Sequence, residues 1–236
     1  MIAALGQVEI RDRSGAGESC VADNGFCPGW IADNYDRYVD PFLEHVFLTV
    51  VSLGIGFAIS FGLAVIAHRR RWLVAPVTQV TGILYTLPSI AVFFLLLPLT
   101  GRGRLPAIIA LVAYSLLIIF RNVLLGLDNV PADARDAGRG MGLTQRQLLW
   151  RVELPLALPE ILAGLRIAAT TTVGLATLAF FAGAGGLGGQ IFADITFKSN
   201  VVVAGGLAVL LAVMLDGAIL LLQRAVTPWT RARAGT

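Results

Sequence analysis

The sequence predicts an all-α integral membrane protein with about five transmembrane helices. Its 236 residues are 56% hydrophobic and only 14% charged, whereas soluble domains carry about a quarter charged residues. A bilayer core about 30 Å thick takes roughly 20 apolar helical residues to cross, and several stretches of that length occur. One small soluble core cannot bury so many apolar residues, so the sequence predicts that the bilayer surrounds most of the chain.

Five apolar stretches are expected to form the spans. They cover residues 45–67, 76–99, 105–127, 158–181 and 201–222. The second stretch differs from the others, because polar residues occupy its first half and Pro88 lies in its middle. Polar groups at bilayer depth are tolerated when they are buried among helices or line a cavity. The candidate residues for the translocation path are therefore Gln79, Tyr85, Thr86, Pro88 and Ser89.

The segments around the spans predict an orientation. Residues 1–43 form a polar segment, residues 44–228 form the membrane domain and residues 229–236 form a tail. Ten Lys and Arg residues flank the spans on the side of the tail, against six on the side of the N-terminus. Positive charge favours the inner side, so we expect the N-terminus outside and the tail in the cytoplasm. Cys20 and Cys27 then lie outside, where a disulfide and free thiols both remain open.

Several other chemistries find little support in the sequence. The two histidines lie at opposite ends of one stretch, so no catalytic or metal site is expected. Glycines in segment 183–188 match the spacing of a dinucleotide fingerprint, but they follow a membrane-length stretch where that motif needs a strand. The only lysine, Lys198, is not in a Walker A loop, so no cofactor is expected. Basic residues gather at the ends of apolar stretches, which favours membrane orientation over nucleic-acid binding.

The fourth stretch predicts close helix packing. Its small residues recur at a spacing of four, at Gly164, Ala168, Thr172 and Ala176. Residues at that spacing share one face of a helix. Small side chains on such a face let helices approach closely in lipid, where packing replaces the hydrophobic drive.

Asp216 is an acid within the fifth stretch, about 10 Å from its inner end at a rise of about 1.5 Å per residue. An unpaired acid at that depth is costly, so a partner or a water-filled cavity is expected. Arg166 lies at a similar depth on the fourth stretch, which makes the two residues a candidate buried ion pair. The alternative is that Asp216 faces an aqueous path while Arg166 extends to the interface.

The longest connection, residues 131–160, has helical features. Pro131 and Asp133 suit a helix start, glycines at 140–142 interrupt the helix, and Thr144 can cap a second one. Pro155 is predicted to end that second helix, as is Pro159. The sequence thus predicts a helix-turn-helix on the cytoplasmic face, against the alternative of an ordinary amphipathic loop at the interface.

This connection resembles the cytoplasmic signature of the permeases of binding-protein-dependent ABC importers. That signature reads EAA, three residues, glycine, and later an apolar-Leu-Pro ending. Its counterparts here are Asp136, Ala137 and Gly138 at EAA, Gly142 at the glycine, and Leu154 and Pro155 at the ending. The departure is Asp136, which is one methylene shorter than the usual glutamate. The resemblance implies that these residues of a coupling loop, residues 128–157, contact a separate ATPase.

The likeness extends over roughly residues 45–223. TLPS at 86–89, PAIIALVAYSLLIIFRN at 106–122 and GLATLAFFAGAGGLG at 174–188 look like the permeases of the glycine betaine, carnitine and choline group. This resemblance implies a type I ABC importer permease in the bacterial inner membrane. Its partners would be a second permease, identical or related, cytoplasmic ATPase subunits that bind the ATP, and an extracytoplasmic solute-binding protein. A permease for another solute such as an amino acid, and a membrane-embedded enzyme, are the alternatives.

Overall fold

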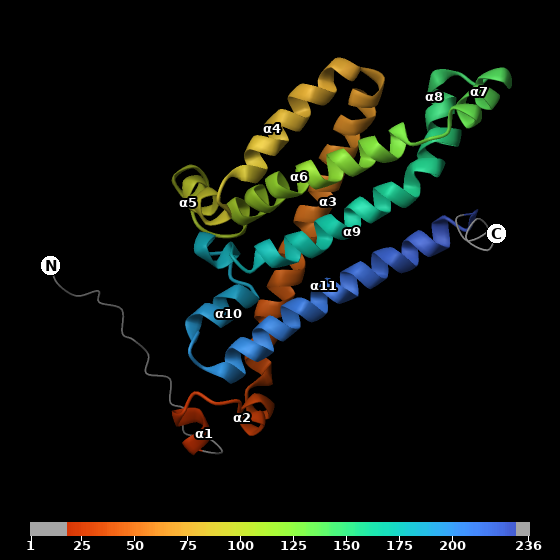
Figure 1. Cartoon of the computed structure of the whole chain (residues 1–236). Coiled ribbons are helices and arrows are strands. Elements are labelled where there is room, and N and C mark those ends of the chain that lie inside the picture. The colour runs from red at the N-terminus through yellow and green to blue at the C-terminus, as the bar shows by residue number, and fades with distance from the viewer. Residues whose placement is uncertain (1–17, 230–236) are drawn as a thin grey trace.

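The computed structural model describes residues 18–229, and every regular element in that range is a helix (Figure 1). The longer helices are α3 (Val39–Arg69), α4 (Val74–Thr86), α5 (Ser89–Thr100), α6 (Arg104–Asp128), α9 (Leu154–Ala176) and α11 (Lys198–Val226). The shorter helices are α1 (Glu18–Ala22), α2 (Pro28–Asp33), α7 (Ala132–Gly140), α8 (Gln145–Leu148) and α10 (Leu187–Ala193). Most of the predicted tail and the first seventeen residues of the predicted outer segment lie outside the described residues.

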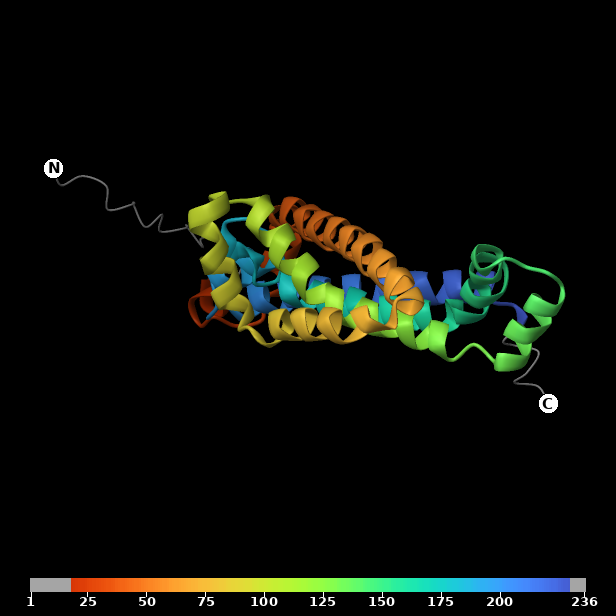
Figure 2. The same ribbon diagram turned by 90° about the horizontal axis from the view of Figure 1, so that it is seen from above.

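Helices α4, α6, α9 and α11 lie side by side as a layer, and α3 crosses that layer and packs against α6 and α9 (Figures 1 and 2). Helix α6 is the centre of the bundle. Its Ile119, Phe120 and Val123 are fully buried in a core that α3 and α9 share. The apolar residues of α11, in contrast, lie mostly at the surface of the chain, as expected for a helix facing lipid or a partner.

Small residues set the distance between α6 and α9. A Cβ atom on Gly164 of α9 would collide with Asn122 of α6, and one on Gly126 of α6 would lie 2.9 Å from the carbonyl oxygen of Ala157. The other small residues of the predicted stripe are also buried, namely Ala168, Thr172 and Ala176. The spacing of four therefore marks the face on which the two helices meet.

The second apolar stretch is not the single straight span that the sequence predicts. It divides into α4 and α5, which meet at an angle of 97°. Pro88 causes the break, since proline lacks an N–H and disfavours a helical conformation in the residue before it. Leu87 is accordingly extended, with a ψ of 137°. The phenol of Tyr114 donates a 2.6 Å hydrogen bond to the carbonyl of Leu87, which satisfies a backbone group that the break leaves open.

The described chain has three helices long and apolar enough to cross a membrane, and the α4–α5 pair can count as a fourth. These three are α3 together with the turn at Tyr35–Tyr38, α6, and α11. Helix α9 is the fifth member of the bundle and lies between α6 and α11 (Figure 1). Helix α3, which holds the first apolar stretch, begins at Val39, a few residues earlier than that stretch.

The prediction that Pro155 and Pro159 end the second helix of the coupling loop is wrong. The chain stays helical from α8 through a π-helical turn, Leu149–Glu153, and on into α9. Pro155 lies directly after the π-helical turn, in the first turn of α9, and Pro159 lies inside the helix. The π-helical turn is wider than an α-helical one, which gives the ring of Pro155 room beside the preceding carbonyls.

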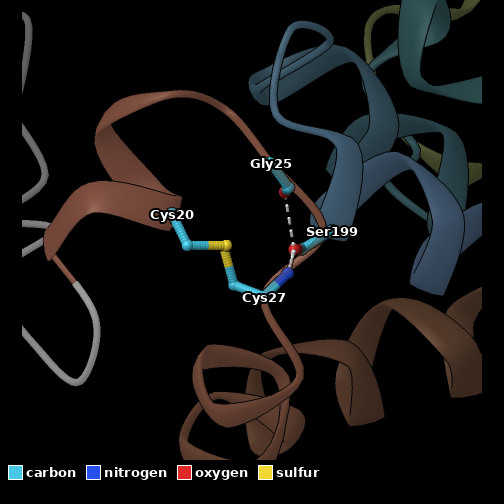
Figure 3. Close-up of a disulfide and its surroundings, with 4 residues drawn as sticks. All are labelled: Cys20, Gly25, Cys27 and Ser199. Atoms are coloured by element: carbon cyan, nitrogen blue, oxygen red, sulfur yellow. Dashed lines mark hydrogen bonds between the residues drawn. A yellow bond between two sulfur atoms is a disulfide. The ribbon is translucent and has the colours of Figure 1, made fainter.

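A disulfide joins Cys20 and Cys27 and closes the α1–α2 hairpin (Figure 3). The hairpin is fixed to the start of α11, because the backbone N–H of Cys27 donates to Oγ of Ser199 at 2.7 Å. The Ser199 hydroxyl in turn donates to the carbonyl of Gly25 at 3.1 Å. One serine thus joins two segments that lie about 170 residues apart in the sequence.

We predict that Gly164→Leu destabilises the fold by about 1–3 kcal/mol, the cost of overpacking a close contact. Any side chain at this position must push α9 away from Asn122 of α6. The matched control is Gly54→Leu on α3, where a Cβ meets nothing within 4 Å. The measurement is the thermal unfolding midpoint of the detergent-purified chain. Equal midpoints for the two variants would contradict this account of the packing.

Candidate functional site

The coupling loop projects from one end of the bundle. Helices α7 and α8 extend beyond α6 and α9, on the same side as the C-terminal end of α11 (Figures 1 and 2). We call this side the loop end. Helices α1, α2, α5 and α10 lie at the opposite side, which we call the cap end (Figure 1).

Local sequence explains how the loop folds. Thr144 caps α8, since its side chain accepts from the N–H of Gln147 while the side chain of Gln147 accepts from the N–H of Thr144. Gly142 adopts a φ of +81°, which reverses the chain between α7 and α8 and favours glycine. Gly138 is buried against α8. A Cβ atom at this position would lie 2.6 Å from the side chain of Leu148, so the close contact requires glycine. The loop is therefore a compact helix-turn-helix.

The structure divides the six predicted coupling residues into two groups. Asp136, Ala137 and Gly142 are exposed on α7 and the following turn. Gly138 packs inside the helix pair, while Leu154 and Pro155 belong to the first turn of α9, where Leu154 is buried in the core. The first group is the part of the six that is open to another protein. The second group fixes the loop to the bundle.

Two large apolar side chains of the loop are exposed, and for one of them, Trp150, the sequence predicts burial together with Leu148 and Leu149, which are buried. Met141 is 72% exposed and Trp150 is 55% exposed, although both belong to a compact, well-packed loop. Exposed aromatic and methionine side chains on such a surface are typical of contacts with a partner protein. A tryptophan in a loop of otherwise polar surface is the signal from which this could have been predicted.

A chain of charged side chains joins the loop to the loop-end termini of the helices, and sequence reasoning missed it. Nε of Arg135 on α7 donates to Oε1 of Glu153 at 2.9 Å, and Oε2 of Glu153 lies 3.5 Å from Nε2 of His68 at the end of α3. Nδ1 of His68 lies 3.2 Å from Oδ1 of Asp128 at the end of α6. Arg71 completes the set with a 2.8 Å bond to Asp128. We call these five residues the junction network.

Four of the five candidate path residues lie at the break between α4 and α5, while Gln79 lies in the middle of α4. Gln79, Tyr85, Thr86 and Pro88 are exposed in this chain, and Ser89 is half-buried. The ring of Tyr85 meets the ring of Tyr114 edge-on, with centroids 6.1 Å apart. This surface is open and partly polar, as a translocation path requires. Its role in such a path stays a prediction.

The structure brings Arg166 and Asp216 together. Nε of Arg166 donates to one carboxylate oxygen of Asp216 at 2.7 Å, and Nη2 donates to the other at 2.8 Å. This two-bonded geometry is the strongest that an arginine and a carboxylate form. The side chains are 30% and 33% exposed, so the pair lies at the edge of the α9–α11 contact, not in the core.

These features define a membrane-spanning helical bundle with a compact loop at one end whose exposed apolar side chains suit a partner protein. The chain belongs to the family of binding-protein-dependent transport system inner membrane components, whose model matches residues 51–231. Its fold is the type I ABC importer permease architecture. The match leaves out α1, α2 and the first part of α3.

Curated relatives and solved structures agree with this family. Osmoprotectant import permease protein OsmW of Salmonella typhimurium (strain LT2) is 38% identical over 206 residues, which are 84% of this chain and 96% of the relative. Choline transport system permease protein OpuBB of Bacillus subtilis (strain 168) is 35% identical over 187 residues, 78% of this chain and 86% of the relative. An inward-facing structure of the MetNI methionine ABC transporter gives a TM-score of 0.70 at 26% identity, covering 80% of this chain and 96% of that one.

We predict that Asp216→Leu lowers the yield of folded protein, because it leaves the guanidinium of Arg166 unpaired within the membrane. Replacing both residues with leucine removes both charges and is expected to restore much of the yield. Arg166→Lys is the charge-conserving control. Size-exclusion chromatography of detergent extracts measures the folded fraction, and a full yield for Asp216→Leu alone would refute the structural role of the pair.

Proposed function

We propose that this chain is the permease subunit of an ATP-driven ABC importer that moves compatible solutes of the glycine betaine, choline, carnitine or proline type. The observation that carries this proposal is the identity of 35–38% to permeases named for osmoprotectants and choline, over 78–84% of the chain. ATP is bound by a separate subunit, and the permease supplies the membrane path. The alternative is that the solute is an amino acid. It is supported only by the lower sequence identity of 26% to the methionine transporter.

The exposed tip of the coupling loop is the proposed contact for the ATPase. The loop presents an acid, Asp136, and two large exposed apolar side chains, Met141 and Trp150. Such a tip suits a cleft that buries the apolar groups and bonds the acid at its edge. Leu154 and Pro155 hold the base of the loop in the bundle, so a push on the tip reaches α9 directly.

Exposed charged side chains within the membrane helices support the presence of a second permease subunit beside this chain. Arg121 of α6 is exposed and forms no hydrogen bond or ion pair with the described residues. The Arg166 and Asp216 pair is also about one-third exposed. Charged groups are costly against lipid and are typical of a bundle interior or a water-filled cavity. We therefore propose that the second permease and the solute path lie against the surfaces that carry these charges.

Two observations support an orientation with the loop end in the cytoplasm. Eight described basic residues lie toward the loop end, namely Arg69, Arg70, Arg71, Arg135, Arg139, Arg146, Arg151 and Arg224, and four toward the cap end, namely Arg37, Arg102, Arg104 and Lys198. The disulfide lies at the cap end, which suits an oxidising space outside the inner membrane. The solute-binding protein then docks at the cap end.

The orientation predicts that a membrane-impermeant maleimide labels Cys20 and Cys27 in intact cells after mild reduction. These are the only cysteines of the chain, so no background from other positions arises. A variant with both cysteines replaced by serine and Gly140 replaced by cysteine is the matched control, because its single thiol lies on α7 at the loop end. Labelling of the control in intact cells, with none of the native pair, would reverse the topology.

The substrate is tested with the solute-binding protein that assembles with this permease. We expect it to bind betaine, choline, carnitine or proline, and we expect proteoliposomes holding the complete complex to take up the bound solute only with ATP inside. Calorimetry and radiolabelled uptake measure the two steps. Binding and uptake of methionine in place of these solutes would refute the substrate class while leaving the permease role intact.

A further inference from the structure

We propose that the junction network is the link by which movement of the coupling loop reaches the membrane helices, with Arg135 and Glu153 as its positioning residues. This inference rests on the proposed function, because it needs an ATPase that moves the loop. It assigns a role to five charged residues that neither the family match nor the named relatives explain. None of the five belongs to the exposed tip of the loop.

Arg135 ties α7 to two other elements at once. Its Nε bonds Glu153, and its Nη2 donates a 2.6 Å hydrogen bond to the carbonyl oxygen of Leu127 in the last turn of α6. That carbonyl is one of the groups that a helix end leaves without an internal partner. A guanidinium holds both acceptors in fixed directions, which the point charge of a lysine cannot do. Arg135 therefore fixes the position of α7 relative to α6 and to the start of α9.

Glu153 is the centre of the network. Its side chain is only 10% exposed, and its two carboxylate oxygens face different partners, Arg135 and His68. It is also the last residue of the π-helical turn that leads into α9. Short π-helical segments are frequent at functional sites. A displacement of Arg135 thus acts at the point where the loop becomes a membrane helix.

His68, Asp128 and Arg71 extend the link to the remaining helices. His68 is the second-last residue of α3, Asp128 is the last residue of α6, and Arg71 lies in the turn that leads into α4. Together with Glu153 and Arg135 the network reaches the loop-end termini of α3, α4, α6 and α9. His68, Arg71, Arg135 and Glu153 line one cavity of about 460 Å³, which gives these side chains room to shift together.

The other attachments of α7 explain why the network matters for motion. Helix α7 packs mainly against α8 and the π-helical turn. The apolar part of this contact includes the packing of Gly138 against Leu148, with Leu143 and Val152 next to it, and none of these three side chains belongs to α6. Arg135 supplies the bond from α7 to α6 itself. Because Arg135 and Glu153 are 21% and 10% exposed, their interaction is screened less than a surface pair.

The test uses the complete transporter in proteoliposomes, with ATP hydrolysis and solute uptake measured in parallel. We expect Arg135→Gln to keep the ATPase subunits bound and hydrolysing ATP while the solute moved per ATP falls by about fivefold or more, the lower range of typical coupling between sites. The amide introduced by this variant can still donate to Glu153, which also stays beside His68, and the folded yield of the variant, measured by size-exclusion chromatography, separates a loss of coupling from a loss of fold. Arg135→Lys should give an intermediate ratio.

Two further variants test whether the loss of coupling is specific to the pair of Arg135 and Glu153. Arg151→Gln is the matched control, since Arg151 is exposed in the same π-helical turn and has no partner in the described chain. Glu153→Gln breaks the same ion pair from the side of α9 and should lower the ratio as Arg135→Gln does. An unchanged ratio in Arg135→Gln, an equal loss in Arg151→Gln, or release of the ATPase subunits would each overturn the proposed link. Absence of ATP-driven uptake in the unmodified complex would instead refute the proposed function.

Discussion

The structure depends most on how it accommodates one buried carboxylate, that of Glu153, where the coupling loop turns into α9. An ionised acid removed from water is costly unless it is paired and hydrogen-bonded. Here its two oxygens face Arg135 and His68, which come from α7 and α3. Satisfying this single group therefore fixes the relative positions of the loop and the loop-end termini of the helices. The same requirement that stabilises the fold makes the loop and the bundle move together.

At the cap end a different set of contacts holds the chain. Tyr38 donates to the side chain of Asn200 at 2.9 Å, and Trp30 meets Phe197 edge-on at 4.7 Å, so the N-terminal hairpin covers the start of α11. Farther along, Asp216 binds α11 to α9. Helix α11 is thus tied at its first turn and again within the membrane, although most of its apolar side chains are exposed. This arrangement leaves one long apolar surface for lipid or a partner while its position stays defined.

Structural features that depend on a few neighbouring residues could be predicted from the sequence. Features that depend on residues far apart in the sequence could not. Apolar length, the Thr144 cap and the small residues around Gly164 each act within a few turns of one helix. The 97° bend and the helix that continues past Pro155 depend on where the freed backbone groups find partners, which composition does not record. His68 and Asp128 are separated by 60 residues, and Arg135 and Glu153 by 18. Only the folded bundle brings these charges together. Arg166 and Asp216 were an exception, since the cost of a charge in the membrane restricts its partners.

The central claim is that the tip of the coupling loop is seated in an ATPase subunit. A photoreactive residue at Met141, on that tip, tests it most directly, with the same residue at Leu99 on α5 as the control because Leu99 is 81% exposed at the cap end. The account predicts that illumination of the assembled complex joins the Met141 variant, and not the Leu99 variant, to the ATPase, as identified by mass spectrometry of the adduct. An ATPase adduct from Leu99, or none from Met141 in a complex that transports normally, would contradict it.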